Sequence, residues 1–293
     1  MGRRGPGPSL DGEGAGLRGV VRSSVEAVAH EQGAVEQFVQ ARTHFGRSLY
    51  QVSAYLVDGL LIDVGPRHCR DRLLRVLGGR RVEVAAVTHA HEDHVGNVGP
   101  LQRGTAFQAF ASEATLAAAS SGGRMPLYRR HVWGRPDGGE LTPTPRTIST
   151  RRYRFDVLDT PGHTPGDLTL VEAAQGWAFT GDLVLSPRQT ITMRQEDLAA
   201  TVASLERVLA YRPRLLFTGI RVFEDGTRVL EERLAFIRGL VSQARSLQRD
   251  GRSATGIRRA LLGREPWLHY WSGGEFGRGH FARQLLASGR ALA

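Results

Sequence analysis

Apolar and polar positions alternate along this chain in short runs that predict strands and helices in turn. The segment Tyr50 to Val57 alternates, and a second apolar run, Leu60 to Ile62, follows the turn pair Asp58-Gly59. An Asp-Gly pair between two such runs is the signature of a β-hairpin. Further apolar runs predict strands at 82–88, 106–111, 155–158, 167–171, 177–180 and 215–218.

Helical patterns separate these strands. The spacing of apolar residues predicts helices over 70–76, 112–119, 197–209, 230–248, 253–262 and 280–287, with Ser112 and Ser253 as N-caps. Because strands and helices alternate, the chain is expected to form a layered α/β fold. The stretch 122–145 is rich in Gly, Pro and Arg, which predicts a surface loop or lid beside the site.

The two ends of the chain differ from the middle. Residues 1–35 are rich in Gly and Arg and offer little apolar surface, which predicts a disordered tail with a short helix near Val25 to His30. Helical patterns and an aromatic turn, Trp267 to Trp271, dominate the other end. We therefore expect a tail at 1–35, a catalytic domain at 36–224 and a C-terminal helical subdomain at 225–293.

The segment Thr88 to Asn97 contains a dense group of metal-binding side chains. Directly after a valine-rich strand, six residues hold four potential ligands: His89, His91, Asp93 and His94. The alternative is a solvated polar loop that happens to contain three histidines. Because the chain has only 10 His, chance rarely produces this pattern, and a metal site is the better interpretation. Imidazole and carboxylate suit Zn²⁺ or Fe²⁺, whereas Ca²⁺ and Mg²⁺ prefer oxygen ligands.

Two later residues can complete such a site. His163 lies in a predicted loop between two strands, where two Pro-Gly pairs restrict the backbone. Asp182 follows a strand and a glycine, at a point where a carboxylate can emerge from a sheet edge. Taken alone, His163 would be a turn histidine and Asp182 a helix N-cap, so both assignments depend on the first motif.

Four motifs in this order resemble the metallo-β-lactamase-fold hydrolases. They are the hairpin segment 55–65, the His-Ala-His-Glu-Asp-His motif at 89–94, Asp-Thr-Pro-Gly-His-Thr-Pro-Gly at 159–166 and Phe-Thr-Gly-Asp at 179–182. The resemblance covers roughly residues 50–220. It implies a four-layer αββα sandwich with the metals at one edge of the two sheets and a C-terminal helical appendage.

The same resemblance implies the ligand sets. A first metal would be bound by His89, His91 and His163, and a second by Asp93 and His94, with Asp182 bridging both. This bridging carboxylate is typical of glyoxalase II-like hydrolases and ribonucleases rather than of true β-lactamases.

One position departs from the family pattern. The family usually carries a last ligand histidine in a Gly-His pair after a late strand, and Ile220 occupies that place here. Because an aliphatic side chain cannot bind a metal, we expect a mononuclear or unevenly loaded centre with zinc, or alternatively iron. His269 or His280 could fold back as a substitute ligand.

The resemblance implies a metal-dependent hydrolase. A bound metal lowers the pKa of water from about 15.7 to about 7, which gives a hydroxide at neutral pH, and it polarises a carbonyl or phosphoryl oxygen. Asp93 would orient this water or accept its proton, and the substrate would be an ester, thioester, lactone or phosphodiester. Asn97 and Thr164 are close in sequence to the ligands and are predicted to hydrogen-bond them.

Two other functions stay open. The persulfide dioxygenases of this fold use one iron, and a centre weakened at its second position is compatible with such an enzyme. A protein that has lost catalysis would instead use its arginine-rich surface to bind RNA or another acidic partner.

Composition narrows the possible partners and the cellular compartment. The formal net charge is +10 and every basic residue is an arginine, but the arginines are scattered and support nucleic-acid binding only weakly. A single cysteine, Cys69, excludes an internal disulfide and fits a reducing compartment. No apolar run approaches the roughly 18 residues of a membrane span, and no apolar signal sequence follows Arg3 and Arg4. We expect a cytoplasmic protein that acts on a small molecule.

Overall fold

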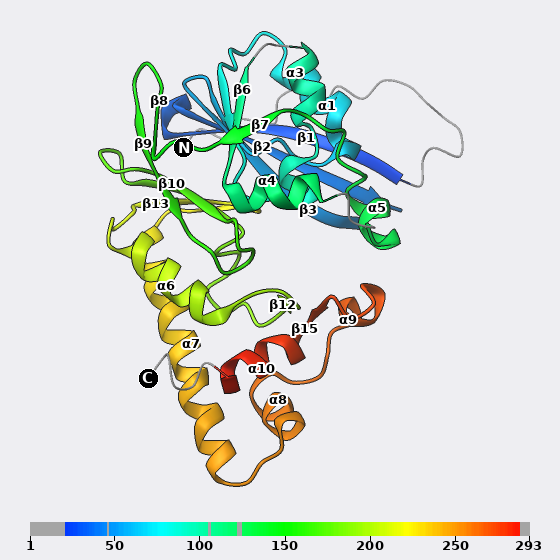
Figure 1. Ribbon diagram of the computed structural model, residues 1–293, viewed down its shortest axis with the longest axis vertical. Coiled ribbons are helices and arrows are strands. Elements are labelled where there is room, and N and C mark those ends of the chain that lie inside the picture. Colours follow the sequence, from blue (N-terminus) through cyan, green and yellow to red (C-terminus); the bar gives the residue numbers. More distant parts are fainter. Residues whose placement is uncertain (1–20, 46, 105–106, 122–124, 288–293) are drawn as a thin grey trace, which may run out of the picture.

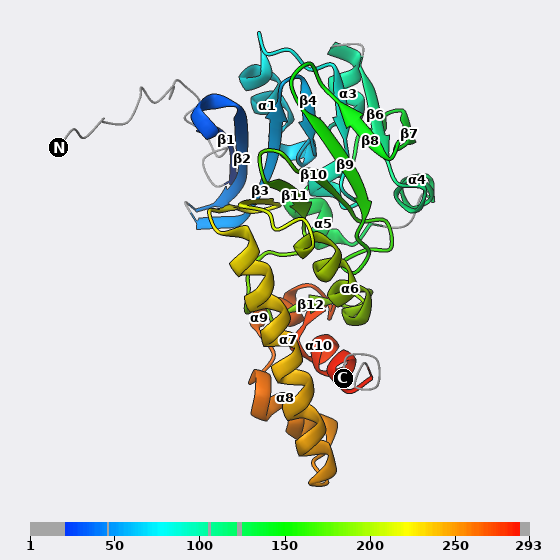
Figure 2. The same cartoon turned by 90° about the vertical axis from the view of Figure 1, so that its left-hand side faces the viewer.

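The computed structural model describes residues 21–287, apart from residue 46, residues 105–106 and residues 122–124. Two large β-sheets pack face to face, and helices cover the outer face of each (Figure 1, Figure 2). This arrangement confirms the predicted αββα sandwich. Further helices continue from the second sheet and form the lower part of the molecule in Figure 1, which confirms the C-terminal helical appendage.

The first sheet contains seven strands in chain order. Its first four strands are antiparallel, and the other three extend it in parallel through connections that contain helices. At the turn between the third and fourth strands, Asp58 and Gly59 both have positive φ, 46° and 89°, so the Asp-Gly hairpin is confirmed. The strands are β1 (Val21–His30), β2 (Val35–His44), β3 (Arg47–Val57), β4 (Leu60–Ile62), β5 (Val84–Ala86), β6 (Gln108–Ala111) and β7 (Leu141–Pro143).

The second sheet contains six strands in the order β14-β13-β11-β10-β9-β8. All neighbours in it are antiparallel except β11 and β13, which are parallel and connected through a helix. The strands are β8 (Thr147–Ser149), β9 (Arg154–Asp159), β10 (Leu168–Glu172), β11 (Trp177–Gly181), β13 (Leu215–Thr218) and β14 (Val222–Phe223). A separate small pair joins β12 (Thr192–Met193) to β15 (Phe276–Gly277) near the C-terminal helices.

Helices pack on both outer faces. Those between the strands of the first sheet are α1 (Arg70–Leu77), α2 (Glu92–Val95), α3 (Val98–Gly104), α4 (Glu113–Ser120) and α5 (Leu127–Val132). The side chain of Ser112 accepts a hydrogen bond from the backbone of Thr115 and so caps α4 as predicted. The later helices are α6 (Leu198–Leu209), α7 (Gly226–Arg249), α8 (Ala254–Leu262), α9 (Trp267–Trp271) and α10 (Arg278–Ala287).

Three apolar clusters hold these layers together. Between the sheets, Tyr55 of β3 contacts Phe179 and Phe217, whose stacked ring centroids are 4.5 Å apart. A second cluster lies between the first sheet and its helices, and a third joins the second sheet to α6, α7, α8 and α10. The third cluster therefore continues across residue 224, and the C-terminal helices share the core of the second sheet. Among the described residues, no helix combines the length and apolar character that crossing a bilayer requires.

The N-terminal prediction is wrong for residues 21–35. These residues form β1 and a short 3₁₀ turn, not a tail with a helix, and β1 pairs with β2 over ten residues. The alternation in β1 is weak in sequence because Ser, Glu and Ala occupy many of its positions, and its half-buried positions change face between residues 25 and 28. Pairing with β2 supplies the stability that the segment itself does not indicate. Residues 1–20 lie outside the described part of the chain.

Two predicted loops contain regular structure. The proposed lid at 122–145 includes α5 and β7, and the aromatic turn at 267–271 is the short helix α9. In each case the element is short, five or six residues for the helices and three for the strand. Contacts with neighbouring elements, rather than local periodicity, stabilise elements of this length.

Candidate metal centre

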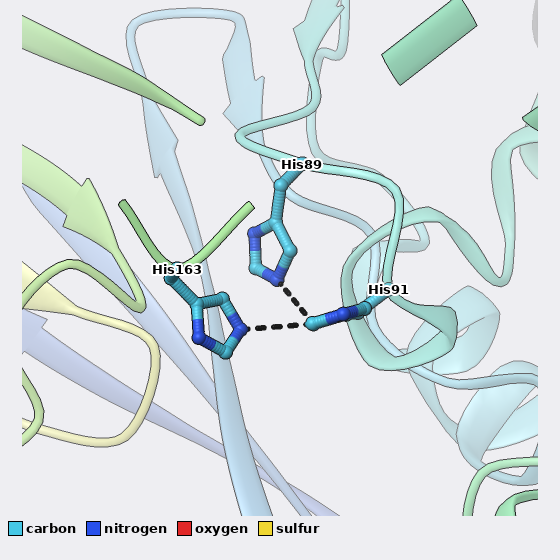
Figure 3. Close-up of side chains that lie close together, drawn as sticks. All are labelled: His89, His91 and His163. Carbon is cyan, nitrogen blue, oxygen red and sulfur yellow. Dashed lines mark hydrogen bonds between the residues drawn. The ribbon is translucent and has the colours of Figure 1, made fainter. Parts of the chain in front are cut away.

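Three imidazoles from two loops point toward one another (Figure 3). His89 and His91 follow β5, and His163 lies between β9 and β10. The Nδ1 atom of His91 is 3.0 Å from Nε2 of His89 and 2.9 Å from Nε2 of His163. Ligand nitrogens around one tetrahedral zinc ion are roughly 3.3 Å apart, so this spacing fits a single ion. These residues are called the three-histidine position below.

A second group adjoins the first. The Nε2 atom of His94 is 3.4 Å from Oδ1 of Asp182 and 3.9 Å from Oδ2 of Asp93. The other oxygen of Asp182, Oδ2, is 3.7 Å from Nε2 of His163. The two oxygens of Asp182 therefore face different imidazoles, as a bridging ligand requires. Asp93, His94 and Asp182 are called the carboxylate position below.

Two buried polar atoms in the carboxylate position lack a hydrogen bond. Nε2 of His94 and Oδ1 of Asp182 are both inaccessible to solvent and have no hydrogen-bond partner among the described residues. Buried polar atoms without partners are rare because their lost hydration is not replaced. The two atoms face each other at 3.4 Å as an ion pair, and a cation that replaced the proton of Nε2 would contact both of them. The residues present thus fit a bound metal.

Hydrogen bonds from neighbouring side chains orient the imidazoles. Asp63 accepts from Nδ1 of His94 at 2.7 Å, and Glu196 accepts from Nδ1 of His163 at 3.2 Å. The hydroxyl of Thr88 lies between Asp63, at 2.9 Å, and Nδ1 of His89, at 3.1 Å. An imidazole held at one nitrogen presents the other to a metal. The roles of Asp63 and Glu196 were not predicted, since only folding brings them to the histidines.

Burial and charge divide the histidines into two kinds. Burial lowers the pKa of His89 and of His91 well below the usual value, and neighbouring imidazoles lower it further. Burial also opposes charge on His94, but Asp63, Asp182 and Asp93 outweigh it and raise its pKa. For His163, Glu196 and Asp182 overcome burial and raise the pKa to about 9. His89 and His91 are therefore neutral and ready to donate lone pairs, whereas the other two carry protons until a cation replaces them.

The end of β13 closes the carboxylate position. A Cβ atom on Gly219 would lie 2.0 Å from Oδ1 of Asp182 and 3.2 Å from Cε1 of His94. The backbone can approach this closely only because residue 219 is glycine. Ile220 follows directly, is half-buried, and accepts a hydrogen bond from Gln51 through its carbonyl at 3.3 Å. Its side chain offers no metal ligand.

Four other predicted contributors act elsewhere. His269 and His280 bond to backbone carbonyls of Phe276 and Gly274, each at 2.8 Å, so the predicted substitution for the missing histidine is wrong. Asn97 donates to three carbonyls between Val64 and Pro66, and Thr164 donates to Asp167. Neither bonds a ligand: Asn97 satisfies carbonyls of the segment that follows β4, and Thr164 satisfies a carboxylate of its own loop.

A groove of about 660 Å³ opens beside His91. Its walls come from α2, α3, α4 and α5 and from the loop after His163, and Glu275 of the C-terminal region contributes to it. The sequence predicted a surface loop or lid beside the site at 122–145, and Met125, Arg129 and Leu141 from that stretch line the groove. A substrate can therefore lie against the three-histidine position.

Comparisons with known proteins agree with this geometry. Residues 47–220 match the model of the family described as the metallo-beta-lactamase superfamily. A hydroxyacylglutathione hydrolase from Bdellovibrio bacteriovorus is 25% identical over 124 residues, which are 42% of this chain and 41% of that protein. The match thus spans about two-fifths of the curated relative.

Solved structures show the same fold. A metallo-beta-lactamase family protein from Thermus thermophilus superposes with a TM-score of 0.59 at 20% identity, covering 92% of both chains. A protein crystallised in a di-iron-bound form superposes with a TM-score of 0.50 at 24% identity, covering 61% of this chain and 92% of that one. At these identities the likeness concerns the fold alone.

Proposed function

Because the chain belongs to the metallo-beta-lactamase superfamily, we propose that it is a metal-dependent hydrolase acting on a small-molecule ester or thioester. The observation that carries the proposal is a pair of buried atoms, Nε2 of His94 and Oδ1 of Asp182, which face each other without a hydrogen bond beside three converging imidazoles. Such a donor set suits a transition-metal ion. A solvated polar loop would not leave these atoms buried without a hydrogen bond.

The two positions hold metal unequally in this proposal. The three-histidine position binds an ion through His89, His91 and His163, with Oδ2 of Asp182 as a fourth donor. The carboxylate position offers Asp93, His94 and Oδ1 of Asp182, and it has no histidine at residue 220. We assign the tighter site to the three histidines and a weaker one to the carboxylates. The ion is zinc in this proposal, since imidazole and carboxylate suit it, and iron is the alternative.

Asp93 is the residue of this chain that moves the proton. When bound, the metal polarises the substrate carbonyl and lowers the pKa of water toward neutrality. Burial raises the pKa of Asp93 to about 6, although His94 opposes this shift. A carboxylate with a pKa near the working pH is an effective general base. When the weaker carboxylate position holds no ion, Oδ2 of Asp93 is free to accept the proton of the attacking water, and Asp63 keeps His94 in place by its bond to Nδ1.

The choice of an ester or thioester rests on a relative. The curated relative is named for hydrolysis of hydroxyacylglutathione, and the centre described here has the donors that such a reaction needs. The segment that the two proteins share covers only part of each. The choice between a thiol and an alcohol leaving group is therefore tested by assays on both kinds of substrate.

The test is metal content measured by elemental mass spectrometry, combined with hydrolysis assays, on protein purified without added metal. We expect close to one zinc ion per chain and turnover of thioesters or esters. Bound iron, together with oxygen consumption when a glutathione persulfide is added, would instead indicate a persulfide dioxygenase. Protein that stays free of metal after incubation with zinc and with iron would refute the proposal.

A further inference from the structure

The groove beside His91 begins at the metal centre and leads away from it. His91 and Gln195 border both, and their Nε2 atoms lie 3.5 Å apart. Thr164, next to His163, lines the same end of the groove. A group attached to a carbonyl at the metal centre therefore enters the groove directly.

Small apolar side chains form the walls of the groove. Val95 and Val98 line one side, and Ala114 and Ala118 of α4 line another. The two alanines are four residues apart, so they lie on the same face of the helix. Leu141, Met125 and three prolines complete the apolar lining. Side chains of this kind bind a hydrocarbon chain by removing it from water, and they offer few groups that would hold a polar one.

The charged residues of the groove compensate one another. Arg129 has only 8% of its side chain exposed and is paired with Glu92 on one side and Glu275 on the other. Burial alone would lower the pKa of Arg129, but these two carboxylates outweigh it and raise the pKa. The guanidinium is thus engaged by carboxylates of the protein. Arg135, exposed at the rim, is the other cation of the lining. Among the described residues of the lining, two positive and two negative charges balance, so this part of the groove does not favour an anionic ligand.

We propose that this groove binds the unbranched acyl chain of a neutral ester or thioester substrate. The inference rests on the proposed hydrolase function and specifies its substrate class. The carbonyl lies at the metal centre, with the chain between α4 and the valines of α2 and α3. Water oxygen bonds to the carbonyl carbon, the bond to the thiol or alcohol leaving group breaks, and the proton taken from water passes to that leaving group. The products are a carboxylate with its released proton and a free thiol or alcohol.

The first experiment measures kcat/KM for a series of thioesters, from acetyl to decanoyl, with one uncharged leaving group. Burial of each additional methylene increases kcat/KM by up to about fourfold until the groove is full. A flat series, or a preference for a thioester of anionic glutathione over the decanoyl compound, would overturn the proposal.

Two tryptophan variants of α4 locate the effect. Ala118 lines the groove, whereas its exposed neighbour Ala117 does not. In A118W the indole fills the groove, and the decanoyl-to-acetyl ratio of kcat/KM falls at least tenfold. A117W carries the same substitution on the same helix and retains the wild-type ratio. Equal ratios in the two variants would contradict the placement of the chain.

A binding measurement separates this inference from the proposed function. Calorimetric titration with octanoate and with acetate requires no turnover. Tighter binding of octanoate to wild-type protein and A117W than to A118W would support the groove even if no thioester were hydrolysed, in which case the hydrolase proposal alone would fail. Hydrolysis without chain-length dependence, together with equal binding of octanoate and acetate, would leave a hydrolase and overturn the acyl groove.

Discussion

The two halves of the metal centre are built in different ways. The three-histidine position uses imidazoles whose nitrogens are already about 3 Å apart, and two of them are neutral. The carboxylate position contains a histidine kept charged by three aspartates and ends at Ile220, where a further donor is missing. The three-histidine position has a full set of ligands. In the carboxylate position, metal binding depends on neighbouring residues, above all on Asp63.

This difference teaches which residues decide metal loading. In the three-histidine position the ligands themselves decide it, because three donors and a carboxylate make up a tetrahedral set. In the carboxylate position the decisive residues are Asp63, which orients His94, and Gly219, which lets β13 approach Asp182. The following predictions test this contrast, beginning with the largest effect.

Replacing His91 with alanine should remove the ion from the three-histidine position and lower kcat/KM at least about 1000-fold, since electrostatic stabilisation at the reacting centre is lost. Metal content by mass spectrometry and hydrolysis rates measure the effect. His131→Ala, an exposed histidine on α5, serves as the control and should keep both. Full activity in H91A would break the contrast between the two positions.

Asp63→Asn tests the dependence of the carboxylate position on its support. The amide cannot accept from His94 as the carboxylate does, so affinity for the second ion should fall about 10- to 100-fold, as for other residues that orient ligands. Glu196→Gln is the matched change at His163, and it should weaken the first ion instead. Competition with a chromophoric chelator measures both affinities. If both variants lose the same ion, the two positions are not separable.

Ile220→His should supply the missing donor. Metal content is expected to rise from near one to near two ions per chain. The control variant Ile220→Leu should keep the wild-type metal content. Titration followed by elemental analysis decides the point. A stoichiometry of one in I220H would show that residue 220 does not reach the carboxylate position.

The smallest expected effect is proton release on metal binding. In metal-free protein the pKa of His163 is about 9, so at pH 7 this imidazole is protonated and must lose its proton to bind. His89 and His91 are already neutral. Loading the three-histidine position should therefore release about one proton, and affinity should fall as the pH decreases. Calorimetry in buffers of different ionisation enthalpy measures this release, and binding without release at pH 7 would contradict the charge assigned to His163.

Sequence alone predicted the candidate ligands that the structure brings together, because most of them are adjacent in the chain. His89 to His94 follow one strand, and His163 and Asp182 follow two others that end at the same edge. The succession of strands and helices predicted a layered α/β fold, and the motif resemblance implied the sandwich. The strand β1 was missed because its polar composition indicates a strand only once β2 pairs with it. Asp63 and Glu196 were missed as orienting residues because hydrogen bonds between distant segments leave no periodic signal.

The pairing of Arg129 with Glu275 sets an order for folding during synthesis. A ribosome delivers α5 well before residue 275, and until then the buried guanidinium has only Glu92 as a partner. The wall of the groove beside His91 is therefore completed by a residue made 146 positions later. A nascent chain can assemble its metal ligands before it acquires its finished substrate groove.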